Sequence, residues 1–398
     1  GYYAGNRALV CLGFGLAALI FLAAGNAINA LRDVSITRSH YPRAFEDDNL
    51  RVTLTIKSGS LHPLYVPEIT DTFPAGDHYW IPIVIPRAVF QNAETIIEYS
   101  EECSRRRGIY FLGPVKVSCS DPLGVFKSRR EIQELSRLLV YPKAQDLEYF
   151  EVLGDGTLTR IGIETLLRSG HCEEFIGLRE YREGDNPRRI HWPSSVRHDR
   201  FLVKEFLENI TTEVTLILDM HRLALSGIGD VTSVEYIIQA AADITGIAIE
   251  KNHLVQMFAL SANLAHVPPG GGRDHLLTIL DSLTYLRPQG EGAFEDDLEK
   301  VIPLLKRGST AILITGSANV HANRLNPLIR VMIGRHIRVI MVIIDDTSFH
   351  KVYRDQEAQR RRALPIEELK GSLYREGCAL YLAGKGDDLA VRLQTPAI

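Results

Sequence analysis

The hydrophobic pattern of the chain begins with an uninterrupted apolar run. Residues 8–25 contain no charged side chain. A helix of this length rises about 1.5 Å per residue and reaches roughly 27 Å, which is enough to cross the hydrocarbon core of a bilayer. The run offers no polar face to water and is longer than the apolar core of a signal peptide. We therefore expect a transmembrane anchor over residues 1–32 rather than a buried soluble helix or a signal peptide.

The basic residues beside this run predict its orientation. Arg7 precedes the run, whereas Arg32, Arg38 and Arg43 follow it. Positive charge is enriched on the cytoplasmic side of membrane spans. We expect an inner-membrane protein with its soluble bulk in the cytoplasm. Because the chain starts at Gly1 rather than Met, a preceding span remains an open expectation.

Short alternating runs split by Pro and Gly follow the anchor. The stretch RVTLTIKSG alternates apolar and polar residues, and similar runs recur every eight to twelve positions up to residue 141. This spacing is typical of an antiparallel sandwich or barrel. We assign residues 33–145 to a β-sandwich-like domain. Its prolines are expected at strand edges and turns, since proline cannot donate to a ladder; they are Pro63, Pro67, Pro74, Pro82 and Pro86.

The last part of the chain alternates continuous apolar runs with amphipathic stretches. EVTLILD, LVQMFAL, TAILITG, IRVIMVIIDD and CALYLAG are typical of strands buried on both faces, and helical periodicity separates them. Such alternation predicts βαβ units in a doubly wound, mostly parallel sheet. We assign residues 211–398 to this α/β domain and residues 146–210 to an irregular connection. The fold class is therefore α/β plus β behind a transmembrane helix.

Composition narrows the function. The formal net charge of -4 argues against a nucleic-acid binder. The five cysteines lack a CxxC pair, which favours reduced thiols. A disulfide between Cys103 and Cys119 remains an alternative if the domain is extracytoplasmic. No GxSxG elbow, HExxH helix or phosphate loop occurs. We predict no cofactor, and a non-enzymatic role is favoured.

The most unusual stretch is residues 175–206, FIGLREYREGDNPRRIHWPSSVRHDRFLVKEF. It holds seven Arg or Lys, five Asp or Glu, two His and one Trp without a clean period. Arginine forks suit carboxylates or phosphates, and acidic neighbours supply internal partners. FLVKEF is expected to form a short strand that pairs with the main sheet. The candidate residues are Arg179, Tyr181, Gly184, Asp185, Arg188, Arg189, His191, Trp192, Ser195, Arg197, Lys204 and Glu205.

Three roles remain open for this stretch. The first is a salt-bridge network that locks an irregular segment onto the α/β domain, so that Asp185→Ala or Arg189→Ala would destabilise. The second is an anion- or partner-binding surface. The third is a catalytic centre, since His191 and His198 flank Ser194 and Ser195. Binding of anionic lipid by this stretch is disfavoured by its acidic residues.

GLREYREGDNPRRIHWPSSVRHDRFLVKEF closely resembles the signature of the bacterial domain-of-unknown-function 58 family. RRRGIYFLGPVKVSCSDPLGVFKSRR and the Gly5–Asn6 pair before the span are also similar to that family. The resemblance implies a membrane-anchored protein with a β-rich middle and a von Willebrand factor A-like domain. It also implies partnership with a MoxR-type AAA+ ATPase in a chaperone-like or assembly role.

Such α/β domains often bind a divalent cation through D-x-S-x-S after the first strand. The matching positions here are Asp219, His221 and Leu223, and the later strand ends at Thr315 and Ser317 without the expected Asp. Leu supplies no oxygen ligand for magnesium. We predict a degenerate site that binds no metal, with Asp219, His221, Thr315 and Ser317 as strand-end loop residues.

The sequence therefore predicts a membrane-anchored interaction or assembly protein. Its expected partners are a MoxR-type AAA+ ATPase, other membrane or envelope proteins, and the bilayer through the N-terminal helix. The alternative is a metal-dependent hydrolase or transferase that uses His191 and the strand-end loops around Asp219 and His221.

Overall fold

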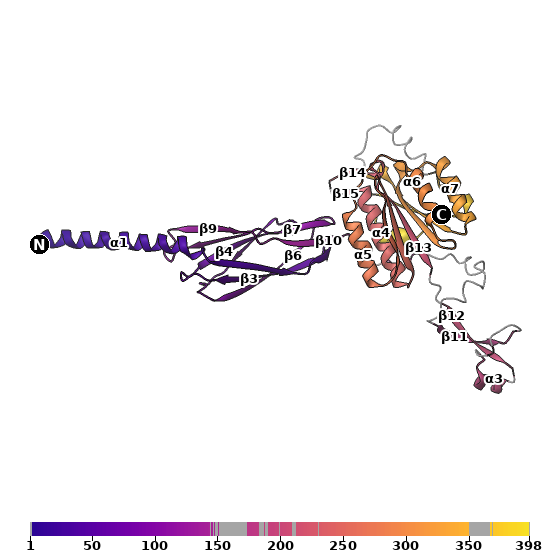
Figure 1. The fold of residues 1–398 in the computed structure, drawn as a ribbon, viewed down its shortest axis with the longest axis horizontal. Helices are drawn as coiled ribbons and strands as arrows, with labels where there is room; N and C mark the ends of the chain where they lie inside the picture. The colour runs from indigo at the N-terminus through magenta and orange to yellow at the C-terminus, as the bar shows by residue number, and fades with distance from the viewer. Residues whose placement is uncertain are drawn as a thin grey trace. The chain divides into compact units, whose positions relative to one another are not determined.

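A computed structural model shows a mixed α/β chain with one apolar N-terminal helix and several β-sheets (Figure 1). The chain divides into two compact units. The first, called the β unit, comprises residues 1–145, 228–230 and 278–287; the second, called the α/β unit, comprises residues 146–227, 231–277 and 288–398. The structure describes residues 2–143, 145, 147, 150, 173–182, 187, 190–198, 200–208, 212–229, 231–349, 367 and 369–397.

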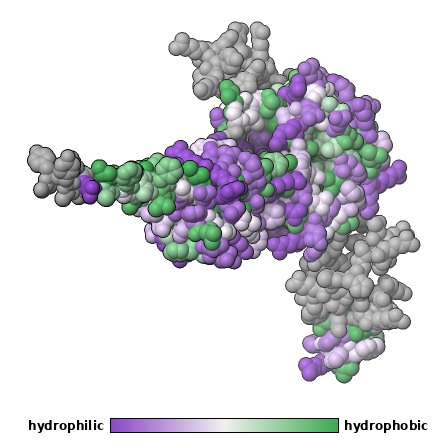
Figure 2. All heavy atoms as spheres, turned by 60° about the vertical axis from the view of Figure 1, so that its left-hand side comes forward, coloured by the Kyte–Doolittle hydropathy of each residue, from purple (hydrophilic) through white to green (hydrophobic). Residues whose placement is uncertain are grey.

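Helix α1, Tyr2–Ala30, contains the apolar run. Its segment Leu9–Ala30 is 22 residues long and apolar enough to cross a membrane. Most of this segment is exposed and hydrophobic (Figure 2). At its C-terminal end, Ala23 and Ala27 are buried where the helix contacts strands β8 and β9. The helix therefore continues from an apolar, exposed segment directly into the packed β unit.

Three sheets of short strands build the β unit, in the orders β1-β3-β6, β2-β10-β7 and β5-β4-β8-β9. Apolar side chains at alternate positions converge on one core that includes Leu54, Ile69 and Val117. The bounds are β1 Val34–His40, β2 Arg43–Phe45, β3 Asn49–Ser58, β4 Tyr65–Thr72, β5 Trp80–Val84, β6 Glu94–Glu102, β7 Gly108–Leu112, β8 Val115–Ser120, β9 Lys127–Ile132 and β10 Ser136–Tyr141.

Two prolines show how these strands tolerate a missing donor. Pro82 lies in β5, at the edge of its sheet, as expected. Pro67 lies inside β4, which has neighbours on both sides, where the register with β8 shifts between Tyr65 and Glu68. The irregularity at this point accommodates the proline. Cys103 and Cys119 are free and buried.

The α/β unit contains a six-stranded sheet in the order β17-β16-β13-β18-β19-β20. All neighbours pair in parallel except β17, which runs antiparallel at one edge. The five parallel strands are almost wholly buried, as continuous apolar runs predict. The bounds are β13 Glu213–Asp219, β16 Leu254–Leu260, β17 Ala265–Gly270, β18 Thr310–Gly316, β19 Arg338–Ile344 and β20 Ala379–Ala383.

Helices cover both faces of this sheet (Figure 1). Helices α4 and α9 contact one another and the sheet, whereas α6 and α7 pair with each other on the opposite face. Helix α6 ends at Val301 because Pro303 follows in a 3₁₀ turn. The bounds are α4 Ser233–Glu250, α5 Arg273–Tyr285, α6 Phe294–Val301, α7 Ala322–Gly334 and α9 Leu389–Gln394.

The charged stretch forms a separate hairpin. Strand β11, Glu173–Glu180, pairs antiparallel with β12, Leu202–Glu208, and helix α3, Trp192–His198, lies between them in sequence. The expectation that FLVKEF joins the main sheet is therefore wrong. Alternation identifies a strand but not its partner, and here the partner precedes it in the same stretch.

Candidate functional site

Strand β13 ends in a fully buried acid, Asp219. It lies at the carboxyl ends of the parallel strands, where ligands bind in folds of this kind. Asp219 accepts hydrogen bonds on both oxygens. Its Oδ2 accepts from the Thr315 hydroxyl at 2.7 Å and from the Asn319 side-chain amide at 2.9 Å. Its Oδ1 accepts from the backbone N–H of His221 at 3.1 Å. These donors satisfy a charge that burial would otherwise destabilise.

His221 connects this acid to a helix. Its Nδ1 lies 2.8 Å from Asp219 Oδ1, and its Nε2 lies 2.9 Å from Asp297 Oδ2 on α6. The hydrogen bond to Asp219 raises the pKa of His221, and Asp297 adds to the shift against the opposing effect of burial. With a carboxylate at each ring nitrogen, the protonated imidazolium can donate on both sides. We call Asp219, His221, Asp297, Thr315 and Asn319 the strand-end centre.

The outer acid of this centre is held by an exposed lysine. Lys300 Nζ lies 2.6 Å from Asp297 Oδ1. Burial acts to raise the pKa of Asp297, but bonds from Lys300 and His221 outweigh it and hold that pKa below its usual value. Gly292 leaves room for the imidazole, since a Cβ there would lie 3.0 Å from His221 Nε2.

A second buried acid lies after β19. Asp346 Oδ2 accepts from the backbone N–H of Ala318 at 2.6 Å, and the backbone N–H of Asp346 donates to Ser317 Oγ at 3.1 Å. Burial raises the pKa of Asp346 to about 6. Its Oδ1 is buried and has no hydrogen-bond partner within the described part of the chain. A protonated carboxyl is thus favoured there below about pH 6.

The motif D-x-S-x-S is altered in the strand-end centre. His221 occupies the first serine position of D-x-S-x-S, and its ring bridges two acids. Leu223 occupies the second serine position and is half exposed. Within residues that the structure describes, no group of three His, Cys, Asp or Glu side chains is arranged to hold a metal ion. The hydrogen bonds of the strand-end centre therefore join a loop, a strand end and a helix.

The signature residues divide by what the structure describes. Trp192 and Arg197 are exposed, Tyr181 is at the margin of exposure, His191 is half-buried and Ser195 is buried. Arg179, Lys204 and Glu205 lie on β11 and β12, with their side chains outside the description. Four signature residues lie outside the described residues: Gly184, Asp185, Arg188 and Arg189. The substitutions predicted to destabilise, Asp185→Ala and Arg189→Ala, fall on two of them.

His191 and Ser194 are in contact, and His191 caps the start of helix α3. His191 Nδ1 lies 2.8 Å from Ser194 Oγ and accepts the backbone N–H of Ser194 at 3.4 Å. An acceptor that satisfies an N–H of the first helical turn is a cap. Ser195 Oγ donates to the carbonyl of His191 and accepts the N–H of Leu202 at 2.9 Å, which ties α3 to β12. These contacts account for His191 and Ser195 as structural residues of the hairpin.

Three aromatic rings gather on this hairpin. Phe201 makes edge-to-face contacts with Tyr181 at 6.3 Å and with Trp192 at 6.0 Å between ring centroids. Trp192 is 58% exposed and Phe201 56% exposed. We call Tyr181, Trp192 and Phe201 the aromatic cluster. Exposed aromatic groups of this kind are enriched at protein interfaces.

Sequence reasoning missed one member of the strand-end centre, Asp297. No local sequence pattern shows that Asp297 reaches His221. Asn319 follows Thr315 in a loop already placed at the strand ends, so its position was a usable signal. Ser317 was identified, but it bonds to Asp346 rather than to Asp219.

Comparison with known proteins identifies one family. Residues 177–351 match the model described as "Protein of unknown function DUF58", which covers less than half of the chain. The match supports the resemblance seen in the signature and extends it to most of the six-stranded sheet. No curated protein matches the chain.

Three of the solved structures that resemble this chain each match about a quarter of it. The CARDB domain of a Pyrococcus furiosus protein is 7% identical with a TM-score of 0.20, over 27% of this chain and 94% of that one. A cohesin module of a Clostridium perfringens family 33 glycoside hydrolase is 10% identical with a TM-score of 0.21, over 28% and 98%. A Listeria innocua β-glucosidase is 12% identical with a TM-score of 0.18, over 27% and 16%. TM-scores this low define neither fold nor activity.

Proposed function

We propose that the chain is a membrane-anchored docking protein that works with a MoxR-type AAA+ ATPase in assembly of other membrane or envelope proteins. Helix α1 anchors it in the inner membrane, with both units in the cytoplasm. The observation that carries the docking role is the aromatic cluster, because three adjoining rings remain substantially exposed in the family signature. Exposed apolar patches with polar surroundings are typical of interaction sites.

The α/β unit is proposed to be von Willebrand factor A-like. Its strand order, its antiparallel edge strand and the acid after the first strand support this assignment. The strand-end loop that follows is fixed by hydrogen bonds and presents exposed side chains: Arg222 donates its N–H to the carbonyl of Gly290 at 2.9 Å, and Leu223 and Leu225 are exposed. A rigid loop with apolar tips binds a partner at low entropic cost.

The test is capture of a MoxR-type ATPase by the full-length chain in detergent. Trp192→Ala is expected to weaken binding by at least about 30-fold, the effect of losing an interface tryptophan worth about 2 kcal/mol. Trp80→Ala, which removes the only other tryptophan, serves as the matched control and should bind like the wild type. The melting temperature of each variant is measured alongside.

Two results would contradict the proposal. The wild-type chain fails to bind the ATPase, or Trp192→Ala binds as tightly as Trp80→Ala. The alternative, a metal-dependent hydrolase or transferase, requires Asp219 to exchange its present donors for a metal. Calorimetric titration of the chain with Mg²⁺ or Mn²⁺ tests that alternative, and saturable binding that Asp219→Asn abolishes would support it.

A further inference from the structure

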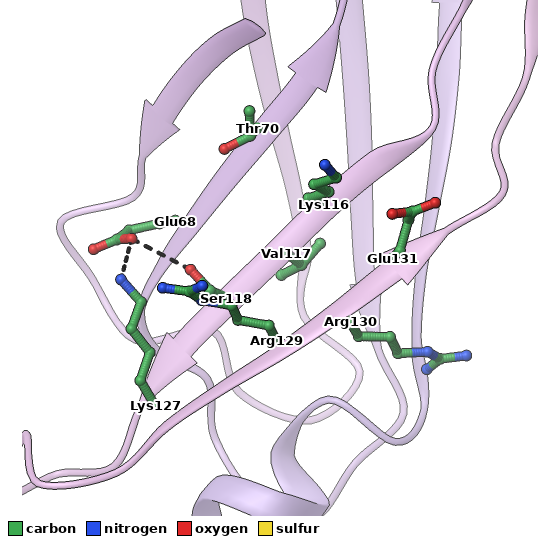
Figure 3. Close-up of a pocket in the computed structure, with 9 residues that line it drawn as sticks. All are labelled: Glu68, Thr70, Lys116, Val117, Ser118, Lys127, Arg129, Arg130 and Glu131. Carbon is green, nitrogen blue, oxygen red and sulfur yellow. Dashed lines mark hydrogen bonds and ion pairs between the residues drawn. The ribbon is translucent and has the colours of Figure 1, made fainter.

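The outer face of one sheet in the β unit is hollowed and basic. A groove with a cavity volume of about 340 Å³ crosses β4, β8 and β9 (Figure 3). Its lining has four basic and two acidic side chains, so it carries an excess of two positive charges. The lining residues are Glu68, Thr70, Lys116, Val117, Ser118, Lys127, Arg129, Arg130 and Glu131.

The basic side chains are only partly neutralised. Lys127 forms an ion pair with Glu68, and this bond, together with the charge of Arg129, holds the pKa of Glu68 below its usual value. Arg130 donates to the carbonyls of Leu31 and Arg32 at 2.7 Å, and neutral carbonyls leave its charge uncompensated. Arg129 forms no ion pair with any carboxylate that the structure describes.

The groove begins at the membrane end of the β unit. Ser128 donates its hydroxyl to the carbonyl of Ala27, within the apolar segment Leu9–Ala30. Lys127 and Arg129 flank Ser128 on β9. From there the strand rises about 3.3 Å per residue away from the helix end. These two basic side chains therefore lie within one or two residues of the point where the span enters the β unit.

Apolar loop tips surround the same helix end. Ser60 bonds to the carbonyl of Asn29 at 3.1 Å, and the next residue, Leu61, is 80% exposed. The loop before β6 reaches the same place, since Asn92 donates to the carbonyl of Ser58, and it exposes Phe90. The turn between β8 and β9 exposes Leu123 and Val125. Apolar tips next to basic side chains match the boundary between acyl chains and headgroups.

We propose that this face of the β unit binds the headgroups of anionic phospholipids, with Arg129 and Lys127 as ligands of the lipid phosphate. The proposal rests on the membrane anchoring of the proposed function. Headgroup binding seats the β unit against the bilayer and gives it a fixed height above the membrane. It also adds positive charge on the side of α1 that is expected to be cytoplasmic, where anionic lipids attract basic residues.

The experiment measures lipid binding to the full-length chain in detergent by native mass spectrometry. Phosphatidylglycerol, phosphatidylcholine and inorganic phosphate are added separately. The wild type is expected to prefer phosphatidylglycerol. A hydrogen bond to a charged group contributes about 1.5–3 kcal/mol, so Arg129→Glu should weaken phosphatidylglycerol binding by at least about 10-fold. Arg51→Glu is the matched control, because Arg51 is an exposed strand arginine at the end of β3 far from Ser58 and α1.

Three outcomes would overturn the proposal. The first is equal binding of phosphatidylglycerol and phosphatidylcholine, and the second is an equal loss in Arg129→Glu and Arg51→Glu. The third is binding of inorganic phosphate with the same dependence on Arg129, which would identify a site for free phosphate. Carbonate extraction of the chain from membranes separately tests anchoring. A chain that stays in the membrane but lacks lipid preference refutes this proposal alone.

Discussion

Each unit buries a basic side chain against a carboxylate, but the basic side chain differs between them. In the β unit, the side chains of Arg38 and Asp71 are fully buried and form an ion pair. In the α/β unit, the buried His221 bridges Asp219 and Asp297. A guanidinium remains charged throughout the pH range of folded proteins, whereas an imidazole titrates near neutrality.

The surroundings of Arg38 complete its hydrogen bonds. Its Nε donates to Asp71 Oδ2 at 3.1 Å, and its remaining nitrogens reach Asp71 Oδ1, the carbonyls of Leu112 and Glu134, and the hydroxyl of Ser136. Asp71 also accepts from the Tyr99 hydroxyl at 2.7 Å. Desolvation and the Asp71 charge raise the pKa of Tyr99, so this phenol stays protonated and donating.

The difference shows that a buried ion pair can be made either permanent or adjustable by the choice of cation. The β unit, which contains helix α1, holds a permanent pair. The α/β unit holds a pair whose basic member, His221, titrates, and this pair lies at the carboxyl end of β13.

The largest expected effect is Asp71→Ala, which leaves Arg38 buried without its partner. Removal of one member of a buried pair costs about 3–5 kcal/mol. Urea unfolding of the full-length chain in detergent measures this loss, and it should be independent of pH between 6 and 8. A loss below about 1 kcal/mol would show that Arg38 is solvated rather than paired.

An intermediate effect is expected for His221→Asn, which keeps a donor to Asp219 but cannot titrate. At pH 6 the variant should be less stable by about 1–3 kcal/mol, since a hydrogen bond to a charged group is lost. The raised pKa of His221 means that its contribution is full below its unfolded value and is lost as pH rises through the folded value.

Unfolding free energies of wild type and His221→Asn should therefore converge as pH rises above neutrality. Both proteins also lose stability as pH rises through about 6, because Asp346 has its pKa raised to that value. Parallel curves for the two proteins between pH 6 and 9 would contradict a charged His221.

The smallest effect is expected for an exposed ion pair, which serves as the reference for the two buried pairs. Lys57 Nζ lies 3.5 Å from Glu94 Oε2, and both side chains are more than half exposed. Lys57→Gln should change the unfolding free energy by less than about 1 kcal/mol and should lose even that at high salt. A change as large as that of Asp71→Ala would mean that burial is not what distinguishes these pairs.

The sequence predicted the elements whose burial on both faces is visible in their apolar composition. EVTLILD and TAILITG are continuous apolar runs because both of their faces are covered, and they form β13 and β18. By contrast, no strand was predicted at PPGGGR, although Pro268–Gly270 ends strand β17. An edge strand tolerates proline and need not be apolar, so it leaves little pattern to detect.

The buried charges could not be predicted for a different reason. Arg38 was interpreted as a charge beside the membrane span, but alternation along β1 places it in the interior, opposite Asp71 from another sheet. His221 was identified as a departure from D-x-S-x-S, whereas its bridge to Asp297 joins residues 76 positions apart. Such pairs depend on how elements pack, and a single sequence does not record that packing.

The edge strand β17 also determines how the sheet can associate with other chains. An open edge is a template on which a strand from a second molecule can add, and this is a route to aggregation. Pro268 and Pro269 have no N–H to donate, and they lie in the strand that closes this side of the sheet. Addition of a further strand is thereby blocked over part of this edge. The sheets of neighbouring molecules are thus kept from joining along this part of the edge.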